Sequence, residues 1–416
     1  MNPDTPACGH DTLKSSLSSA DSLVCARRFS DTRQVADTIL QQVSLVLEYP
    51  VVFASDVFAP GATVLADVLA RREHGRRHRV AAIVDAGVAA AWPDLIAAIT
   101  AWADRDPARV ELAAPPWTIP GGEAAKDAAV LDELVRRLAA LRIDRHAFVL
   151  AIGGGAALDV AGYAAATLHR GVRLVRMPTT VLGQNDAGVG VKNGINAFGA
   201  KNFLGTFAAP FAVIDDSRFL TTLAVRDRVA GMAEAVKVAL VRDAAFFAWL
   251  VAHADALVRF ELAVVEPMIR RCAELHLAHI ASGGDPFEQG NARPLDFGHW
   301  AAHKLELLTG HALRHGEAVA IGMVLDARYS VEAGLLDEAS LAAIVGLLER
   351  LGLPVWDDAL REPALLDGLA EFREHLGGEL TITVLAGIGR GVDCRDVQPE
   401  LLRRALQWME APRRAA

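Results

Sequence analysis

The sequence predicts an α/β domain built on a parallel sheet, followed by an all-helical (all-α) domain. Three observations support this fold class. At 416 residues, the chain is longer than one ordinary domain. Between residues 51 and 213, short β-type runs alternate with alanine-rich helical runs, which indicates parallel strands joined by helices. After residue 215 amphipathic helical periodicity dominates, and strand-like residues return only at 380–385.

Each part of the chain follows from its own pattern. Residues 1–34 are polar and lack the apolar core of a signal peptide, so we expect a flexible leader. The α/β domain is expected over 35–215, with strands at 80–85, 148–152 and 173–177 and with ligands at their carboxyl ends. The helical domain is expected over 216–416, with helices across 225–280 and 300–348.

Composition excludes several classes of protein. A hydrophobic content of 52% with 22% charged residues is globular, and the net charge of −9 argues against a nucleic-acid binder. The four cysteines are scattered without a C-x-x-C pair, as in a reducing cytoplasm. The apolar stretch 147–168 contains three glycines and Asp159, so we predict a strand, a turn and a helix rather than a membrane span.

A glycine triplet at 153–155 lies between a predicted buried strand and a predicted helix. Such a turn lets the backbone approach a pyrophosphate, and the helix N-terminus supplies unpaired N–H groups. The triplet is not the G-x-G-x-x-G fingerprint, so a plain strand-to-helix turn is the alternative. Glu123 and Lys126 after one loop, and the hydroxyls of Thr179 and Thr180 at a strand end, are further candidates for a dinucleotide site.

Two imidazoles and a carboxylate form a candidate metal site. His299 and His303 are four residues apart and share one helical face, while His315 belongs to a second helix. Glu234 precedes Lys237 by one turn on another helix. We predict Glu234, His299 and His315 as ligands of Zn²⁺ or Co²⁺, with His303 facing the substrate. A pair of solvated or core histidines is the alternative.

The segment 185–202 carries two lysines, an aspartate and four asparagines among glycines. We expect a polar, adaptable loop whose Lys192 and Lys201, together with Arg170, contact phosphate or polyol groups. An ordinary surface loop is the alternative, which interleaved apolar residues such as Phe198 disfavour.

Together these residues resemble the sugar phosphate cyclase superfamily, whose best-known member is 3-dehydroquinate synthase. The matching motifs run from about residue 80 to 389 and include G-G-G-x-x-x-D, P-T-T, D-x-x-V-x-x-K, G-x-A-E-x-x-K, F-G-H-x-x-x-H and H-G-E-A-V-A. The resemblance implies a Rossmann-like NAD domain, a helical metal domain and a homodimer. It also implies a phosphate-eliminating lyase, in which a ring alcohol is transiently oxidised, phosphate leaves, and ring opening precedes aldol closure.

The resemblance assigns roles residue by residue. The metal positions are Glu234, His299 and His315. The NAD positions are Asp85, Glu123, Lys126, Gly154, Gly155, Asp159, Thr179, Thr180, Lys201 and Thr222. The catalytic positions are Asp186, Lys192, Lys237 and His303. Asn202 falls at a substrate position, and Arg170 is expected to reach the phosphate in the neighbouring subunit.

Three departures from 3-dehydroquinate synthase bear on the substrate. Asp296 stands where that family has asparagine, and it would repel the carboxylate of that family's substrate. The region 272–288 holds no lysine to bind a carboxylate, and Arg293 lies one residue closer to the first histidine than the family's arginine. The segment 372–383 resembles the sedoheptulose 7-phosphate cyclases, which make valiolone-type cyclitols.

We therefore predict a cytoplasmic enzyme that converts sedoheptulose 7-phosphate to a valiolone-type cyclitol, with no nucleic-acid or membrane partner. His276 and Asn193 are the expected determinants of the product isomer. Trp300 is bulkier than the threonine expected beside His299, and we expect it to narrow the pocket. Two alternatives stay open: a 3-dehydroquinate synthase acting on DAHP in the shikimate pathway, with Arg293 in place of the lysine, and an NAD- and metal-dependent polyol dehydrogenase.

Overall fold

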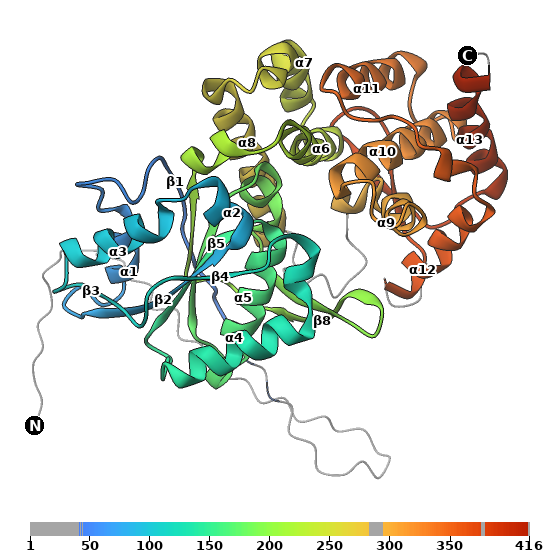
Figure 1. The fold of residues 1–416 in the computed structure, drawn as a ribbon. Helices are drawn as coiled ribbons and strands as arrows, with labels where there is room; N and C mark the ends of the chain where they lie inside the picture. Colours follow the sequence, from blue (N-terminus) through green and yellow to red (C-terminus); the bar gives the residue numbers. More distant parts are fainter. Residues whose placement is uncertain (1–40, 42, 44, 283–293, 376–378, 415–416) are drawn as a thin grey trace, which may run out of the picture. The chain divides into compact units, whose positions relative to one another are not determined.

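The computed structural model describes residues 41, 43, 45–282, 294–375 and 379–414 (Figure 1). The chain divides into two compact units, Met1–Glu48 and Tyr49–Ala416. The described residues of the first unit form no helix or strand. The leader predicted over 1–34 and the substrate candidate Arg293 lie outside the described residues. Every element discussed below belongs to the second unit.

A seven-stranded sheet opens this unit, with the order β1-β9-β6-β5-β2-β3 and β4 also paired with β2. Its strands are β1 (Val51–Ala54), β2 (His78–Asp85), β3 (Val110–Leu112), β4 (Trp117–Ile119), β5 (Phe148–Gly153), β6 (Arg173–Pro178) and β9 (Ala212–Asp216). All of their pairings are parallel. The parallel sheet and the strands predicted at 80–85, 148–152 and 173–177 are therefore confirmed.

Helices cover both faces of the sheet (Figure 1). They are α1 (Val64–Ala70), α2 (Ala86–Ala91), α3 (Leu95–Arg105), α4 (Ala128–Ala140) and α5 (Gly155–Thr167). Alternate residues of a strand point to opposite faces. Accordingly, Val80 and Ala82 pack with α1 and α3, whereas Ala81 and Ile83 pack with α4 and α5. Burial on both faces explains why β2 and β5 are apolar throughout.

The apolar stretch 147–168 forms β5, the glycine turn and α5, as predicted. Among the described residues, no helix combines the length and the apolar character that a membrane crossing requires.

The segment 185–202 does not form the loop that we expected. It begins in the π-helical turn η3 (Gly183–Ala187) and continues into an antiparallel hairpin of β7 (Lys192–Ala197) and β8 (Ala200–Phe207). Asn193 and Ile195 are buried, whereas Phe198, which we expected to pack, is 89% exposed. The burial along β7 shows no regular alternation, so the period-2 pattern that predicts a strand is absent from this segment.

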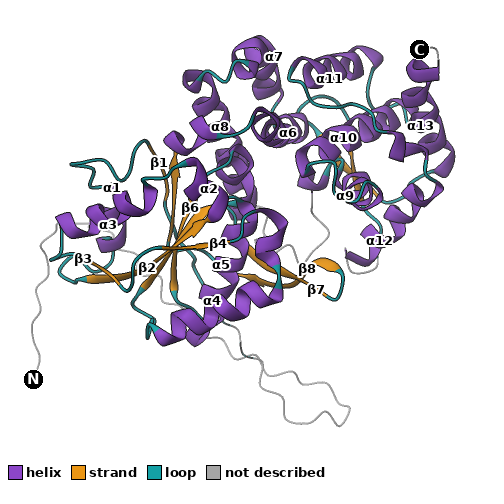
Figure 2. Cartoon of the chain, in the orientation of Figure 1, coloured by secondary structure: helices purple, strands orange, loops and turns teal. Residues whose placement is uncertain are grey.

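The remainder is mainly helical (Figure 2). Its longer elements are α6 (Val225–Arg242), α7 (Ala244–Val258), α8 (Leu262–Ser282), α9 (His299–Leu308), α10 (His315–Glu332), α11 (Glu338–Arg350), α12 (Asp367–His375) and α13 (Pro399–Arg414). Helix α10 is buried along most of its length, as its apolar sequence requires. One antiparallel hairpin, β10 (Ile382–Leu385) and β11 (Gly391–Cys394), adds strands to the expected helical part. The domain boundary at residue 216 stays a prediction.

Candidate active site

The carboxyl ends of β2 and β5 meet beside the glycine turn. Asp85 is the last residue of β2, is 7% exposed, and accepts a hydrogen bond from the backbone N–H of Gly87 at 2.7 Å. A Cβ on Gly153 would lie 2.9 Å from the Cβ of Asp85, so only glycine permits this approach. Gly154 is then the N-cap of α5, and Gly155 is its first residue. The chain order reverses at this pair of strands, where doubly wound sheets bind ligands.

A network of polar side chains ties the short helix η1 (Gly122–Lys126) to α5 and to the hairpin. Lys126 Nζ lies 2.5 Å from Asp159 Oδ2 and donates to Asn202 Oδ1 at 2.5 Å. Glu123 accepts a hydrogen bond from the Asn196 amide at 2.6 Å. Burial raises the pKa of Asp159, although Lys126 opposes that shift. Predicted cofactor residues and a predicted substrate residue therefore share one network.

The three predicted threonines differ in their surroundings. Thr179 is 2% exposed, and its hydroxyl has no hydrogen-bond partner among the described residues. The Thr180 hydroxyl accepts from the Gly183 N–H at 2.9 Å, at the first residue of η3. Thr222 is exposed and donates to the Phe219 carbonyl at 3.4 Å. Only Thr179 offers an unsatisfied buried group.

Glu234 and Lys237, one turn apart on α6, are each 3% exposed. Lys237 Nζ lies 2.8 Å from Glu234 Oε2. The second oxygen, Oε1, is buried without a hydrogen-bond partner among the described residues. Burial raises the pKa of Glu234 to about 7. An unsatisfied buried carboxylate oxygen is costly, and a bound cation would remove that cost.

Asp186, in η3, faces His276 on α8, and its Oδ1 lies 3.1 Å from His276 Nε2. Within the described ranges, donor atoms of Asp186, Glu234 and His276 lie within 4.8 Å of one another. Burial would raise the pKa of Asp186, but His276 and Lys237 outweigh burial and lower it. Asp296 is half-buried, and its charge, after burial, Glu234 and Asp186, also affects the pKa of Lys237.

His299 and His315 are the first residues of α9 and α10, with ring centroids 5.4 Å apart. His299 Nδ1 lies 3.2 Å from the Phe297 carbonyl, and His315 Nδ1 lies 3.2 Å from Glu306 Oε2. An Nδ1–H donor in each ring leaves the Nε2 lone pair for a ligand. Burial, and then Lys237, hold the pKa of His299 well below its usual range, so this imidazole is neutral and suited to bind metal.

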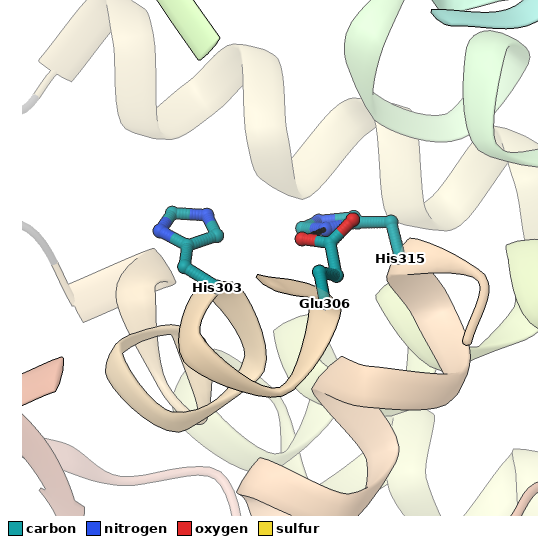
Figure 3. A group of neighbouring side chains, drawn as sticks. All are labelled: His303, Glu306 and His315. Atoms are coloured by element: carbon teal, nitrogen blue, oxygen red, sulfur yellow. Dashed lines mark hydrogen bonds and ion pairs between the residues drawn. The ribbon is translucent and has the colours of Figure 1, made fainter. Parts of the chain in front are cut away.

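Figure 3 shows a second group, in which donor atoms of His303, Glu306 and His315 lie within 4.8 Å of one another. Lys201 Nζ lies 3.1 Å from Glu306 Oε1. Burial would raise the pKa of Glu306, but His315 and Lys201 lower it to about 2. The sequence analysis missed Glu306. Its spacing of seven from His299 and three from His303 places it on their helical face, which is the signal that identifies it.

Arg176 on β6 was also missed. It is fully buried, and it donates to the carbonyls of Gly188, Gly190 and Lys192 at 3.2, 2.9 and 2.8 Å and to Asn193 Oδ1 at 2.5 Å. An arginine inside an apolar predicted strand is the signal that would have identified it. Asn193 is buried and accepts from Arg176, and its expected influence on the product isomer stays a prediction.

Two further residues, Arg170 and Trp300, have other surroundings. Arg170 lines a separate cavity of about 340 Å³ with Asn193 and Thr206. Trp300 is 2% exposed, and its indole N–H donates to Asp326 Oδ1 at 2.8 Å. The expectation that Trp300 narrows the pocket is therefore wrong, because its ring is buried in the helical core.

Comparisons with known proteins agree with this arrangement. Residues 116–230 and 231–372 match the family descriptions 3-dehydroquinate synthase N-terminal and C-terminal. The 2-epi-5-epi-valiolone synthase of Streptomyces glaucescens is 38% identical over 294 residues, covering 70% of this chain and 75% of that protein. The 3-dehydroquinate synthase of Halorhodospira halophila is 38% identical over 290 residues, covering 70% of this chain and 81% of that protein.

Among solved structures, ValA, a 2-epi-5-epi-valiolone synthase from Streptomyces hygroscopicus subsp. jinggangensis with NAD⁺ and Zn²⁺ bound, is 32% identical. It superimposes with a TM-score of 0.79 over 89% of this chain and 99% of that one. The parallel sheet, the helical part and both family matches lead to one conclusion: the chain belongs to the 3-dehydroquinate synthase-like family of sugar phosphate cyclases.

Proposed function

We propose that this chain is a sedoheptulose 7-phosphate cyclase that forms a valiolone-type C7 cyclitol with the aid of NAD and one divalent metal ion, zinc or cobalt. The observation that supports this substrate is the identity of Asp296, a half-buried acid three residues before His299, whose charge also raises the pKa of Lys237. A substrate carboxylate at this position would meet like-charge repulsion. A neutral hydroxymethyl ketone would instead donate a hydrogen bond to Asp296. The similarity to two 2-epi-5-epi-valiolone synthases supports this substrate class.

For the metal we propose Glu234, His299 and His315. Glu234 Oε1 is a buried oxygen without a partner among the described residues, and both histidines have Nδ1 within 3.2 Å of an acceptor. A second possible ligand set consists of His303, Glu306 and His315, and so replaces Glu234 and His299. Glu306 is already engaged by Lys201 and by His315 Nδ1, and a carboxylate in that position orients a metal-binding histidine. These contacts favour Glu306 as the orienting group.

For NAD we propose the turn between β5 and α5. The glycines bring Asp85 beside the start of α5, which suits ribose hydroxyls and a pyrophosphate at the helix N-terminus. Thr179 supplies an unsatisfied buried hydroxyl at the end of the neighbouring strand β6. Lys126 and Asp159 lie on the side of this turn that faces the hairpin. This donor set fits a dinucleotide.

When bound, the divalent ion would supply Lewis-acid chemistry, and NAD would supply a reversible hydride acceptor. The residues of the chain would bind and orient the substrate. Lys237, held by Glu234 Oε2, presents a fixed cation to substrate oxygens. The pair of His276 Nε2 and Asp186 Oδ1 can hold a proton beside the same cluster. His303 lies on the helical face that carries His299, where a substrate would approach.

The alternative function, a 3-dehydroquinate synthase acting on DAHP, has one observation in its favour. Relatives named 3-dehydroquinate synthase reach 39% identity, close to the 38% of the valiolone synthase. This alternative needs a group that binds a carboxylate, and the described helix α8 contains no lysine. Family membership disfavours the polyol dehydrogenase. The homodimer and the cytoplasmic location stay predictions.

Phosphate release from sedoheptulose 7-phosphate and from DAHP, measured side by side with NAD⁺ and Co²⁺ or Zn²⁺, tests the proposal. We expect turnover of the heptulose phosphate alone, without net formation of NADH. A Glu234→Gln variant is the matched control, because it should abolish phosphate release from either substrate. Turnover of DAHP alone would overturn the proposed substrate, and net NADH formation would overturn the reaction class.

A further inference from the structure

Asp326 is a buried acid in an apolar helix. It lies on α10, is 1% exposed, and has buried apolar residues on both sides in Leu325 and Ala327. Burying a carboxyl group is costly unless hydrogen bonds compensate for the lost water. Its neighbours along the helix offer no charged partner, so its hydrogen bonds to other elements explain how it is accommodated.

The carboxyl group of Asp326 bridges the two residues that flank His299. Its Oδ2 accepts from the backbone N–H of Gly298, and its Oδ1 accepts from the indole N–H of Trp300, both at 2.8 Å. One contact fixes the backbone before His299 and the other fixes a side chain after it. Rotation of the first turn of α9 would break at least one of them.

The same helix also contacts this turn through its backbone. Gly298 has a φ of +80°, and a Cβ there would lie 2.7 Å from the backbone nitrogen of Met323. A Cβ on Gly322 would overlap the carbonyl oxygen of Gly298. Helix α10 begins at His315. The element that carries one proposed metal ligand therefore holds the backbone next to the other.

We propose that Asp326 is a positioning residue that fixes His299 for metal binding, with Trp300 as its second anchor. This inference rests on the proposed role of His299 as a ligand. Asp326 acts through the hydrogen bonds to Gly298 and Trp300, since its carboxyl oxygens pair with those two groups. Orienting groups outside the ligand set commonly change metal affinity about 10- to 100-fold.

Two variants test the bridge that Asp326 forms between Gly298 and Trp300. Asp326→Asn sets an amide N–H₂ against one of the two N–H donors, and Trp300→Phe removes the indole N–H while keeping a large ring. The readout is the dissociation constant for Zn²⁺ and Co²⁺, measured by chelator competition on metal-free protein. We expect each variant to bind about tenfold more weakly. The double variant should lose little more than Asp326→Asn alone, because both changes disrupt the same bridge through the Asp326 carboxyl group.

Ser330→Ala is the matched control. Ser330 lies one turn further along α10, is fully buried, and its hydroxyl donates to the Asp326 carbonyl and accepts from the Leu385 N–H. Its loss should lower the thermal stability of the metal-free protein without changing metal affinity. If metal affinity instead followed stability across all variants, the positioning role would be refuted.

His299→Ala distinguishes a failure of the proposed ligand set from a failure of the proposed role of Asp326. If this variant still binds metal as the wild type does, the proposed ligand set is wrong. If it loses tight binding while Asp326→Asn and Trp300→Phe keep wild-type affinity, the ligand set stands and the inference on Asp326 falls. Should Asp326→Asn fail to fold, Trp300→Phe alone decides, since it removes one hydrogen bond and little volume.

Discussion

Arg176, in the middle of β6, donates a hydrogen bond to Asn193 Oδ1 at 2.5 Å and thereby joins the parallel sheet to the hairpin that begins at Lys192. The same guanidinium group binds three backbone carbonyls between residues 188 and 192. One buried cation therefore shapes the segment between two predicted catalytic residues, Asp186 and Lys192. This relationship leads to the first two predictions.

Arg176→Lys should weaken substrate binding and lower stability. A lysine keeps the charge but cannot reach four acceptors, and we expect a loss of about 2–4 kcal/mol in unfolding free energy. We also expect a several-fold increase in KM for the sugar phosphate with little change in NAD affinity. Arg173→Lys is the control, because Arg173 lies on the same strand but pairs with the partly exposed Glu73. Equal KM values for the two variants would contradict the prediction.

Gly162→Ala should destabilise the protein although alanine favours helices. A Cβ on Gly162, in α5, would overlap Asn193 Oδ1 and crowd the Arg176 guanidinium at 3.4 Å. Gly346→Ala in α11 is the control, since nothing lies within 4 Å of its Cβ position. That control should gain about 0.5–1 kcal/mol from helix propensity. Thermal melts of both variants should shift in opposite directions, and a stabilised Gly162→Ala protein would refute the packing argument.

Asp215 should make stability fall as pH rises. Both of its carboxyl oxygens are buried without a partner among the described residues, and burial raises its pKa well above the usual range. The folded state then binds the proton more tightly than the unfolded state. Its stabilising contribution is complete below the unfolded pKa of about 4 and is lost as pH rises towards the folded pKa.

Asp215→Val should therefore stabilise the protein by about 1–3 kcal/mol at pH 8 and by less at pH 5. Melting temperatures at the two pH values provide the measurement. Asp216→Val serves as the contrast. Asp216 accepts hydrogen bonds from the backbone N–H groups of Asp56, Val57 and Arg218, so its loss should destabilise the protein at both pH values. An Asp215→Val protein whose gain is independent of pH would show that Asp215 does not titrate as proposed.

Asp296→Asn should shift substrate preference towards DAHP. Removing the negative charge near Lys237 relieves repulsion of a substrate carboxylate, and a relief of about 1.4 kcal/mol corresponds to a tenfold change. We expect the ratio of kcat/KM for DAHP to that for sedoheptulose 7-phosphate to rise about tenfold or more. Asp132→Asn, at an exposed position on α4, should leave the ratio unchanged. A ratio unaffected by Asp296→Asn would remove the main support for a neutral substrate group.

Much of the architecture follows from local pattern. Continuous apolar runs predicted β5 and the neighbouring strands, because a strand covered by helices on both faces tolerates few polar residues. The three glycines predicted a turn between a strand and a helix, and residues 153–155 do join β5 to α5. The spacing of His299 and His303 predicted a shared helical face, and their rings lie 5.6 Å apart.

The tertiary structure decided which side chains have partners. Glu306 is an acceptor for His315 only because α9 and α10 pack together, and Trp300 has its partner in Asp326 on that same helix. Arg176, on β6 and 16 residues before the hairpin, holds the first two residues of that hairpin by hydrogen bonds. Periodicity and propensity act within a few residues, whereas the burial of a charge is settled by groups that are distant in sequence. The sequence therefore determined most of the elements, and the packing of those elements determined which side chains become hydrogen-bond partners.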